Sequence, residues 1–537
     1  MSNNKTILKD SLVFSCFLVA LILKYVYFGF RYYPVIDDWI QYGTYPLIPD
    51  AWQNVIVKAG YHGTRPLAAL ADIFIWGKFW DNMAIVFFIM TMLHFISGCL
   101  LYKTFEDNQV PVGIAFLIVY GLLPLGSEAT YWISASSRLV VGIFFMSASV
   151  YALTRFLQTE SRRERSVYLI VFLICHLISM GFYEQIILLS FFSAFLIVLA
   201  NLKNSNNKWN LLLPFISFAL ISIYYFSFSK IGQVASRGQL IRGNFLEHIN
   251  YVLRGIARVF TKANFPLLAN GFARGFKILI GEAPLFLLPI IVISAVTAII
   301  AINRSNKDIC KYFYWRIFIG FSLFFVPFIL YFILEQAWIS NRNAFPSFIG
   351  IALIVDTLIN ALLRYRGGRY IITIPVFAMA FIFLVANVSE LSDYKSISQI
   401  DQKICANLAA QSQGTGLLEG KKPALVLNTK PYYIEQNMYY HEHIQNVTES
   451  DWAFTGATRA VARNIKIKRV VPVRVGQELK DINELIKTHI VFGLEDGFNV
   501  VKLNALCKDK NTVILIKENG DVFGEVRDNR FALNTSN

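Results

Sequence analysis

The sequence predicts a polytopic α-helical membrane protein, with about 11 transmembrane helices and a small C-terminal α/β or mixed domain outside the membrane. Of the 537 residues, 55% are hydrophobic and only 16% are charged, and the mean hydropathy of +0.49 is far above a soluble average. Apolar runs recur between Ser11 and Val388, each about 17 to 22 residues long and able to cross about 30 Å of hydrocarbon. No such run follows Ser389.

These runs divide the chain into a multispan domain at 1–390 and a soluble domain at 391–537. The first run should remain as an uncleaved anchor, because no small-residue cleavage site follows it. The expected spans are 11–30, 83–102, 110–125, 138–157, 166–182, 184–200, 210–228, 284–302, 317–334, 346–363 and 370–388.

Basic residues in short loops indicate the orientation. The densest basic loops all fall on one side if the spans alternate, and that side should be cytoplasmic. The prediction is a multi-pass protein of the plasma (inner) membrane, with a cytoplasmic N-terminus and an extracytoplasmic tail. These loops are 162–165, 203–208, 304–316 and 364–369.

The formal charge of +15 also has to be explained. Basic excess in a membrane protein reflects cytoplasmic loops and contact with anionic lipid. Nucleic acid is not an expected partner, because no separate basic domain is present. Membrane lipids are expected partners.

The first outer loop, 31–82, contains an ambiguous segment at 66–80. It is apolar enough to enter the membrane, but it is short and carries Asp72 and Lys78. Counting it as a span would place the later basic loops outside. We therefore expect a half-inserted or interfacial helix.

The long outer loop 229–283 is strongly basic. Arg254, Arg258 and Lys262 recur every four residues, which predicts a basic amphipathic helix on the outer leaflet. Headgroup anchoring and substrate phosphate binding are the two functions open to it. The apolar residues fall largely on another face of this helix: Ile249, Val252, Ile256, Val259 and Phe260.

The tail has strand-like composition. Strands are expected at 424–427, 469–473, 499–503 and 512–516, and a turn at 518–521 precedes another at Val522. The tail also contains Cys405 and Cys507, which leaves a disulfide between them open.

The most informative motif is Asp37-Asp38-Trp39, directly after the first span. Aspartates so close to hydrocarbon are costly when buried and are usually paired or functional. Further polar and aromatic residues lie in the other outer loops. Together they supply carboxylates for base chemistry, guanidinium groups for phosphate and rings for sugar faces. They are Arg65, Glu128, Tyr131, Trp132, Arg138, Tyr183, Glu184, Glu335 and Arg342.

The order of these motifs over residues 1–395 resembles the C-type (GT-C) membrane glycosyltransferases that use polyprenyl-phosphate sugars. Within that class it is similar to the bacterial serotype-converting O-antigen glucosyltransferases. The motifs are Asp37-Asp38-Trp39, Thr64-Arg65-Pro66-Leu67, Tyr131-Trp132, Tyr183-Glu184-Gln185 and Asn341-Arg342.

The resemblance implies transfer of one sugar from an undecaprenyl- or dolichyl-phosphate donor to a cell-envelope glycan or lipid acceptor, on the extracytoplasmic side of the membrane. Asp37 or Asp38 would be the catalytic base. The donor phosphate would be bound by Arg65, Arg138 and Arg342. The expected substrate-binding residues are Trp39, Glu128, Tyr131, Trp132, Tyr183, Glu184 and Glu335.

Two departures from the family pattern and two other functions stay open. Thr64 stands where a glycine is expected, and the first loop lacks an obvious third acidic residue that would complete a Mg or Mn site with the aspartate pair. A divalent cation is therefore an option rather than an expectation. An envelope polysaccharide polymerase or ligase is the main alternative function, and a lipid-linked glycan transporter is the other.

Overall fold

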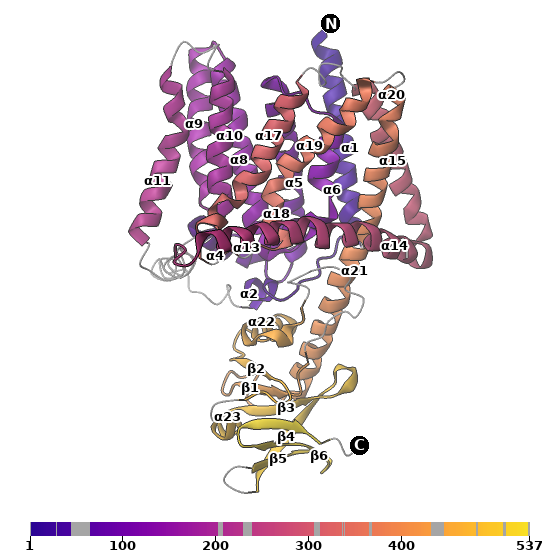
Figure 1. Cartoon of the computed structure of the whole chain (residues 1–537). Helices are drawn as coiled ribbons and strands as arrows, with labels where there is room; N and C mark the ends of the chain where they lie inside the picture. Colours follow the sequence, from indigo (N-terminus) through magenta and orange to yellow (C-terminus); the bar gives the residue numbers. More distant parts are fainter. Residues whose placement is uncertain are drawn as a thin grey trace.

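The computed structural model consists of a helical bundle and a smaller strand-containing domain, joined by one long helix (Figure 1). The N-terminus lies at the end of the bundle that is remote from the C-terminal domain. We call the opposite end the tail end. The structure describes residues 2–27, 29–43, 65–201, 208–228, 239–304, 312–335, 337, 339–364, 368–430, 445–478, 482–508 and 512–534.

The polytopic helical class is confirmed. Within the described residues, 8 helical segments are long and apolar enough to cross a membrane. They coincide with eight of the expected spans, and several are extended by an adjoining 3-10 turn. Their main helices are α5 (Met83–Asp107), α8 (Ile133–Gln158), α10 (Glu184–Asn201), α11 (Leu213–Phe228), α15 (Leu287–Arg304), α17 (Phe313–Phe325), α19 (Phe348–Ala361) and α21 (Thr373–Gln411).

The other three expected spans differ from these. α1 (Ser2–Val26) and α9 (Arg162–Met180) are long helices with charged residues near their ends. α6 (Ile114–Leu122) has only 9 residues. The sequence overestimates its length because the apolar run continues past Pro111 and Pro124, which do not fit a helix interior.

A buried ion pair holds the start of α6. The Asp356 carboxylate accepts hydrogen bonds from the backbone N–H groups of Gly113 and Phe116, at 3.0 and 3.3 Å. Arg316 lies 2.6 Å from the same carboxylate, and both side chains are fully buried. Asp356 therefore caps a helix in the bundle core and is neutralised there.

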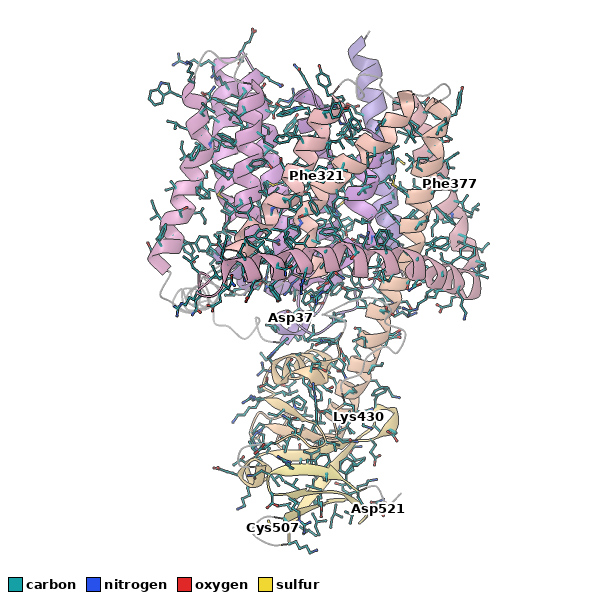
Figure 2. The ribbon with its side chains drawn as sticks, in the orientation of Figure 1. Asp37, Phe321, Phe377, Lys430, Cys507 and Asp521 are labelled. Carbon is teal, nitrogen blue, oxygen red and sulfur yellow. The ribbon has the colours of Figure 1, made fainter. Side chains whose placement is uncertain are left out.

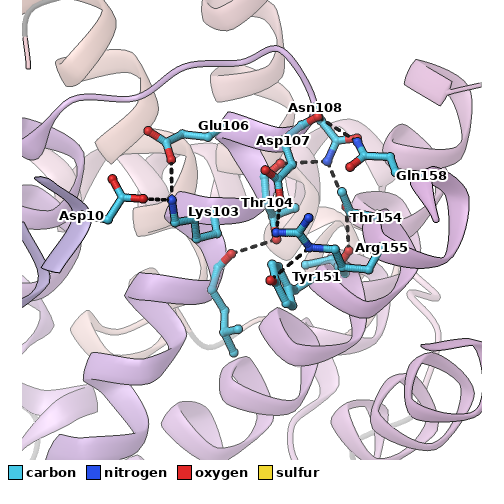
Figure 3. Close-up of polar contacts among 12 residues, drawn as sticks. Asp10, Lys103, Thr104, Glu106, Asp107, Asn108, Tyr151, Thr154, Arg155 and Gln158 are labelled. Carbon is cyan, nitrogen blue, oxygen red and sulfur yellow. Dashed lines mark hydrogen bonds and ion pairs between the residues drawn. The ribbon is translucent and has the colours of Figure 1, made fainter. Parts of the chain in front are cut away.

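At the end of the bundle remote from the tail, polar contacts tie α1, α5 and α8 together (Figure 3). Lys103 bonds both Asp10 and Glu106. Arg155 pairs with Asp107 at 3.1 Å. These contacts hold the helix ends together on the side of the bundle where the basic loops lie.

The segment at 66–80 does not cross the bundle. It forms α4 (Pro66–Phe74) and the 3-10 turn η2 (Trp76–Phe79). Nine helical residues rise only about 14 Å, less than half the hydrocarbon thickness.

A second group of helices lies across the tail end, roughly perpendicular to the spans (Figure 1). It comprises α13 (Phe245–Ala257), the π-helical segment η5 (Arg258–Ala263) and α14 (Asn264–Glu282). Val252 and Ile256 are buried against the bundle, whereas Arg254 and Arg258 are exposed. The apolar and basic residues therefore occupy different faces of this helix, as the sequence pattern predicts.

The C-terminal domain contains a seven-stranded sheet in the order β2-β1-β3-β4-β5-β6-β7. β1 pairs in parallel with β2 and β3, and the remaining pairs are antiparallel. The sequence misses β3 and β7. The strands are β1 (Ala424–Leu427), β2 (Val470–Val473), β3 (Ile490–Leu494), β4 (Val500–Cys507), β5 (Thr512–Lys517), β6 (Val522–Arg527) and β7 (Arg530–Leu533).

Both faces of the sheet are covered. Alternate residues of β1 belong to two separate cores, with Val426 in one and Leu427 in the other. The first core also contains residues of α21 and of α22 (Asp451–Val461), and the second contains Ile486 of α23 (Ile482–Thr488).

The junction between the two domains is continuous helix. α21 runs through the expected boundary at 390 without a break and packs into the C-terminal domain. Cys405 is a buried free thiol and Cys507 an exposed one, so no disulfide joins them.

Candidate functional site

Adjacent aspartates in the Asp37-Asp38 motif have different environments. Asp38 begins α2 (Asp38–Gly43) and is fully buried. Its carboxylate accepts hydrogen bonds from the Tyr32 hydroxyl and from the backbone N–H groups of Val35 and Ser134, the last at 2.9 Å. Asp38 is therefore an internal acceptor that anchors the loop.

Asp37 faces outward. It lies between the helical bundle and the C-terminal domain (Figure 2) and is partly exposed. Its carboxylate makes no hydrogen bond or ion pair with any residue that the structure describes. Of the two aspartates, Asp37 is thus the one open to an incoming molecule.

The backbone before Asp37 is strained. Ile36 has a φ of 31°, a left-handed value that β-branched residues rarely adopt. Such a conformation costs on the order of 1–3 kcal/mol and persists where surrounding contacts fix it. Here Val35 and Ile36 are both buried in the bundle core. The strained position therefore directly precedes the partly exposed Asp37.

Three aromatic side chains hold this loop to the start of α8. The Tyr131 hydroxyl accepts from the Tyr33 backbone N–H at 3.0 Å. The Tyr32 hydroxyl accepts from the Ile133 N–H at 2.8 Å. Trp132 donates its indole N–H to the Val35 carbonyl at 3.3 Å. Tyr131 and Trp132, which the sequence assigns to substrate binding, are almost completely buried and position the aspartate loop.

The Arg342 side chain also contacts Trp132. It belongs to α18 (Asn341–Ala344), and its guanidinium carbon is 5.5 Å from the indole ring centroid. Its Nε is buried without a hydrogen-bond partner. Arg342 also makes no ion pair with a described residue. Trp132 therefore contacts both the aspartate loop and a guanidinium group that lacks a carboxylate partner.

The turn between α9 and α10 joins the same network. The Tyr183 hydroxyl donates to the Asn343 side chain at 2.6 Å. Glu184 forms a bidentate pair with Arg65, at 2.8 and 3.0 Å. The Arg65 guanidinium also lies 4.0 Å from the Tyr183 ring centroid. Arg65 is thus already neutralised by a protein carboxylate.

The remaining predicted residues are less directly connected. Arg138 pairs with the buried Asp72 of α4 at 3.2 Å. Glu128 is buried in α7 (Ser127–Thr130). Glu335 is exposed, and its backbone N–H bonds the Gln239 carbonyl at 2.9 Å. Thr64 lies outside the described residues.

Trp39 belongs to the C-terminal domain core. Its side chain is only 3% exposed and packs with Ile404 and Phe454. Its indole N–H donates to Asp401 of α21 at 3.4 Å, and Asp401 also accepts from the Val447 N–H at 2.9 Å. The sequence predicts that Trp39 binds substrate. In this structure neither face of its indole ring is open to a sugar.

Sequence reasoning missed a polar cluster on α21. Tyr394 lies 4.7 Å, centroid to centroid, from Tyr131, and Asp393 is 2.6 Å from Arg274 of α14. Glu390 is also buried here. The sequence signal that could have found this cluster is Glu390, a carboxylate that follows the last apolar run. Asp37 follows the first apolar run in the same way.

Among the residues that the structure describes, no group of three His, Cys, Asp or Glu side chains could hold a metal ion. Asp50 and His62 of the first outer loop lie outside that part of the chain. The Mg or Mn option accordingly stays a prediction.

Burial gives Asp38 an unusual titration. Desolvation raises the pKa of its carboxyl from 3.8 to about 7, against the effect of its three hydrogen-bond donors. The fold therefore favours the protonated form. The contribution of Asp38 to the free energy of unfolding is complete below about pH 4 and is lost as the pH rises through 7. The free energy of unfolding changes by up to about 4 kcal/mol over this range.

We therefore expect Asp38→Asn to flatten the dependence of thermal stability on pH between 4 and 7. The measurement is the unfolding temperature of the purified wild type and variant across that range. Two parallel curves would contradict a buried, titrating Asp38.

Comparisons with known proteins find a likeness among solved structures only. No family model and no curated protein matches the chain. Among solved structures, it is similar to ArnT from Cupriavidus metallidurans in the apo state, at 13% identity and a TM-score of 0.36, over 93% of this chain and 94% of that chain. At this identity and TM-score no functional argument rests on the likeness, so function has to be argued from the residues.

Proposed function

We propose that this protein transfers a single sugar from a polyprenyl-phosphate donor to a cell-envelope glycan or lipid acceptor, at the tail end of its membrane bundle. The observation that carries the proposal is the arrangement around Trp132. This side chain bonds the loop that presents Asp37 and also contacts Arg342. A base and a phosphate-binding cation are thereby held on one rigid support.

In the proposed reaction, the Asp37 carboxylate takes the proton of an acceptor hydroxyl. The hydroxyl oxygen bonds to the anomeric carbon of the donor sugar while the bond from that carbon to the phosphate oxygen breaks. Negative charge develops on the leaving polyprenyl phosphate. The Arg342 guanidinium would stabilise that charge, because no carboxylate among the described residues pairs with it.

The other arginines are less suited to bind the donor phosphate. Arg65 and Arg138 already pair with Glu184 and Asp72. A phosphate would have to displace a carboxylate from either one. We assign these two pairs to holding the outer loops, and the donor phosphate to Arg342.

Transport is disfavoured by the state of the charges in the bundle. A transporter needs ionisable groups along a pathway. Asp356 is neutralised by Arg316, and Glu184 by Arg65. Lys24 bonds the Gly121 carbonyl at 3.2 Å. These contacts give each of the three charges a structural partner.

Arg342→Ala should reduce sugar transfer by roughly 10²- to 10³-fold, the loss typical of one transition-state charge donor. The measurement compares envelope glycans in cells that express the variant, the wild type or neither. Arg364→Ala is the matched control, because Arg364 ends η9 (Leu362–Arg364) after α19, at the opposite end of that span. Equal losses in both variants would contradict a site at the tail end.

A further inference from the structure

The helix that crosses the tail end carries a cavity that the proposed reaction does not use. This cavity measures about 140 Å³ and lies between α13 and the segment that leads into α18. It is lined by Tyr251, Arg254, Gly255, Arg258, Ala337 and Ile339.

Two guanidinium groups flank the cavity. Arg254 and Arg258 are one helical turn apart and both are exposed. Arg254 makes no ion pair with a described residue. Like charges at this spacing repel each other on a helix, and an anion bound between them relieves that repulsion. The pair is therefore suited to an anionic ligand.

The backbone around the arginines is also specialised. α13 changes to π-helical turns at Arg258, and such turns are rare and concentrate at functional sites. Gly255 approaches the opposite wall so closely that a Cβ there would lie 3.1 Å from Ile339. The helix thus forms one wall of a cavity, and Ala337 and Ile339 line the other wall.

Arg254 and Arg258 are not needed to anchor α13 at the tail end of the bundle. The apolar side of the helix is already held by protein, since Val252 and Val259 are fully buried. Other residues on the helix, including Leu246 and Tyr251, are largely exposed at the level where a membrane surface would lie. Anionic lipid headgroups are therefore the ligands that we consider for this cavity.

We infer that the cavity lined by α13 and by Ala337 and Ile339 binds the phosphodiester headgroup of an anionic membrane lipid. Arg254 and Arg258 would contact the phosphate oxygens. Tyr251 and Ile339 would pack beside the glycerol of the lipid. A bound headgroup would stabilise the segment that continues, after a few residues, into Arg342.

The test uses the full-length protein purified in detergent, with phosphatidylglycerol or phosphatidylcholine added and retained lipid counted by native mass spectrometry. Wild type should retain phosphatidylglycerol in preference to phosphatidylcholine. Arg254→Ala/Arg258→Ala should weaken phosphatidylglycerol binding by roughly tenfold or more. The control Arg242→Ala/Lys277→Ala removes the same charge from exposed positions that do not line the cavity, and it should retain wild-type binding.

Three results would overturn the inference. Equal loss in both double variants would mean diffuse charge attraction, and no loss in either would mean that the cavity is not the site. Displacement of phosphatidylglycerol by an equal concentration of inorganic phosphate or of polyprenyl phosphate would assign the cavity to another ligand. Lipid binding is measured without sugar transfer, so failure here leaves the proposed function untouched.

Discussion

Asp37→Asn is expected to abolish detectable sugar transfer while leaving the fold intact. Removal of a general base costs typically 10²- to 10⁴-fold in rate. The amide is nearly the same size as the carboxylate, and the Asp37 side chain makes no contact with a described residue that the change would break. The measurement compares envelope glycans in cells carrying the variant, the wild-type gene or no gene.

The neighbouring position provides the matched comparison. Asp38→Asn keeps the side chain neutral, as the fold favours, but it places an amide N–H₂ where one of the two carboxyl oxygens accepts a hydrogen bond. That variant should lose both stability and transfer. Asp37→Asn should lose transfer alone, with its unfolding temperature unchanged. Full transfer by Asp37→Asn would eliminate this residue as the base.

Gly456→Ala, on the far side of the domain junction, should impair transfer nearly as much. A Cβ at Gly456 would lie 2.2 Å from the Trp39 carbonyl oxygen. Because the obstructing atom belongs to backbone, α22 and α2 would have to separate. Displacement of a catalytic group by about 1 Å can cost about 10²-fold in rate. Overpacking should also destabilise the junction by about 1–3 kcal/mol.

Hydrogen exchange resolves that displacement directly. The backbone amides of 37–43 should exchange faster in Gly456→Ala than in wild type, together with a loss of envelope glycan. Gly281→Ala is the control, because a Cβ at that glycine would meet nothing within 4 Å. Wild-type exchange and transfer in Gly456→Ala would refute a positioning role for the C-terminal domain.

The fold class could be predicted from composition because the bilayer sets a simple length rule for apolar helices. α6 defeats that rule, since a short helix enclosed by protein can be as apolar as a span. β3 was missed because Gly493 interrupts its apolar pattern. β7 was missed because it is only four residues long and follows a turn with charged residues on both sides, from Arg527 to Arg530.

The candidate site was predicted only in part. Motif order selects Asp37, Asp38 and Arg342 as candidates, but it cannot separate a partly exposed carboxylate from a buried one at the next position. That distinction depends on Ser134, which is 96 residues away in the chain. Likewise, the sequence assigns Arg65 to phosphate binding, whereas the pairing with Glu184 depends on two loops meeting in space.

The junction at Asp37 and Asp38 has a consequence for biosynthesis. Asp38 is anchored in the membrane bundle, and the next residue, Trp39, is enclosed by segments from the last third of the chain. The aspartate loop emerges near the start of synthesis, but its second anchor forms only after α21, α22 and the sheet have been made. A chain whose synthesis stops before α22 would therefore contain the membrane bundle but lack the second anchor of Trp39. The aspartate loop near the start of the chain therefore reaches its final position only when the C-terminal domain folds.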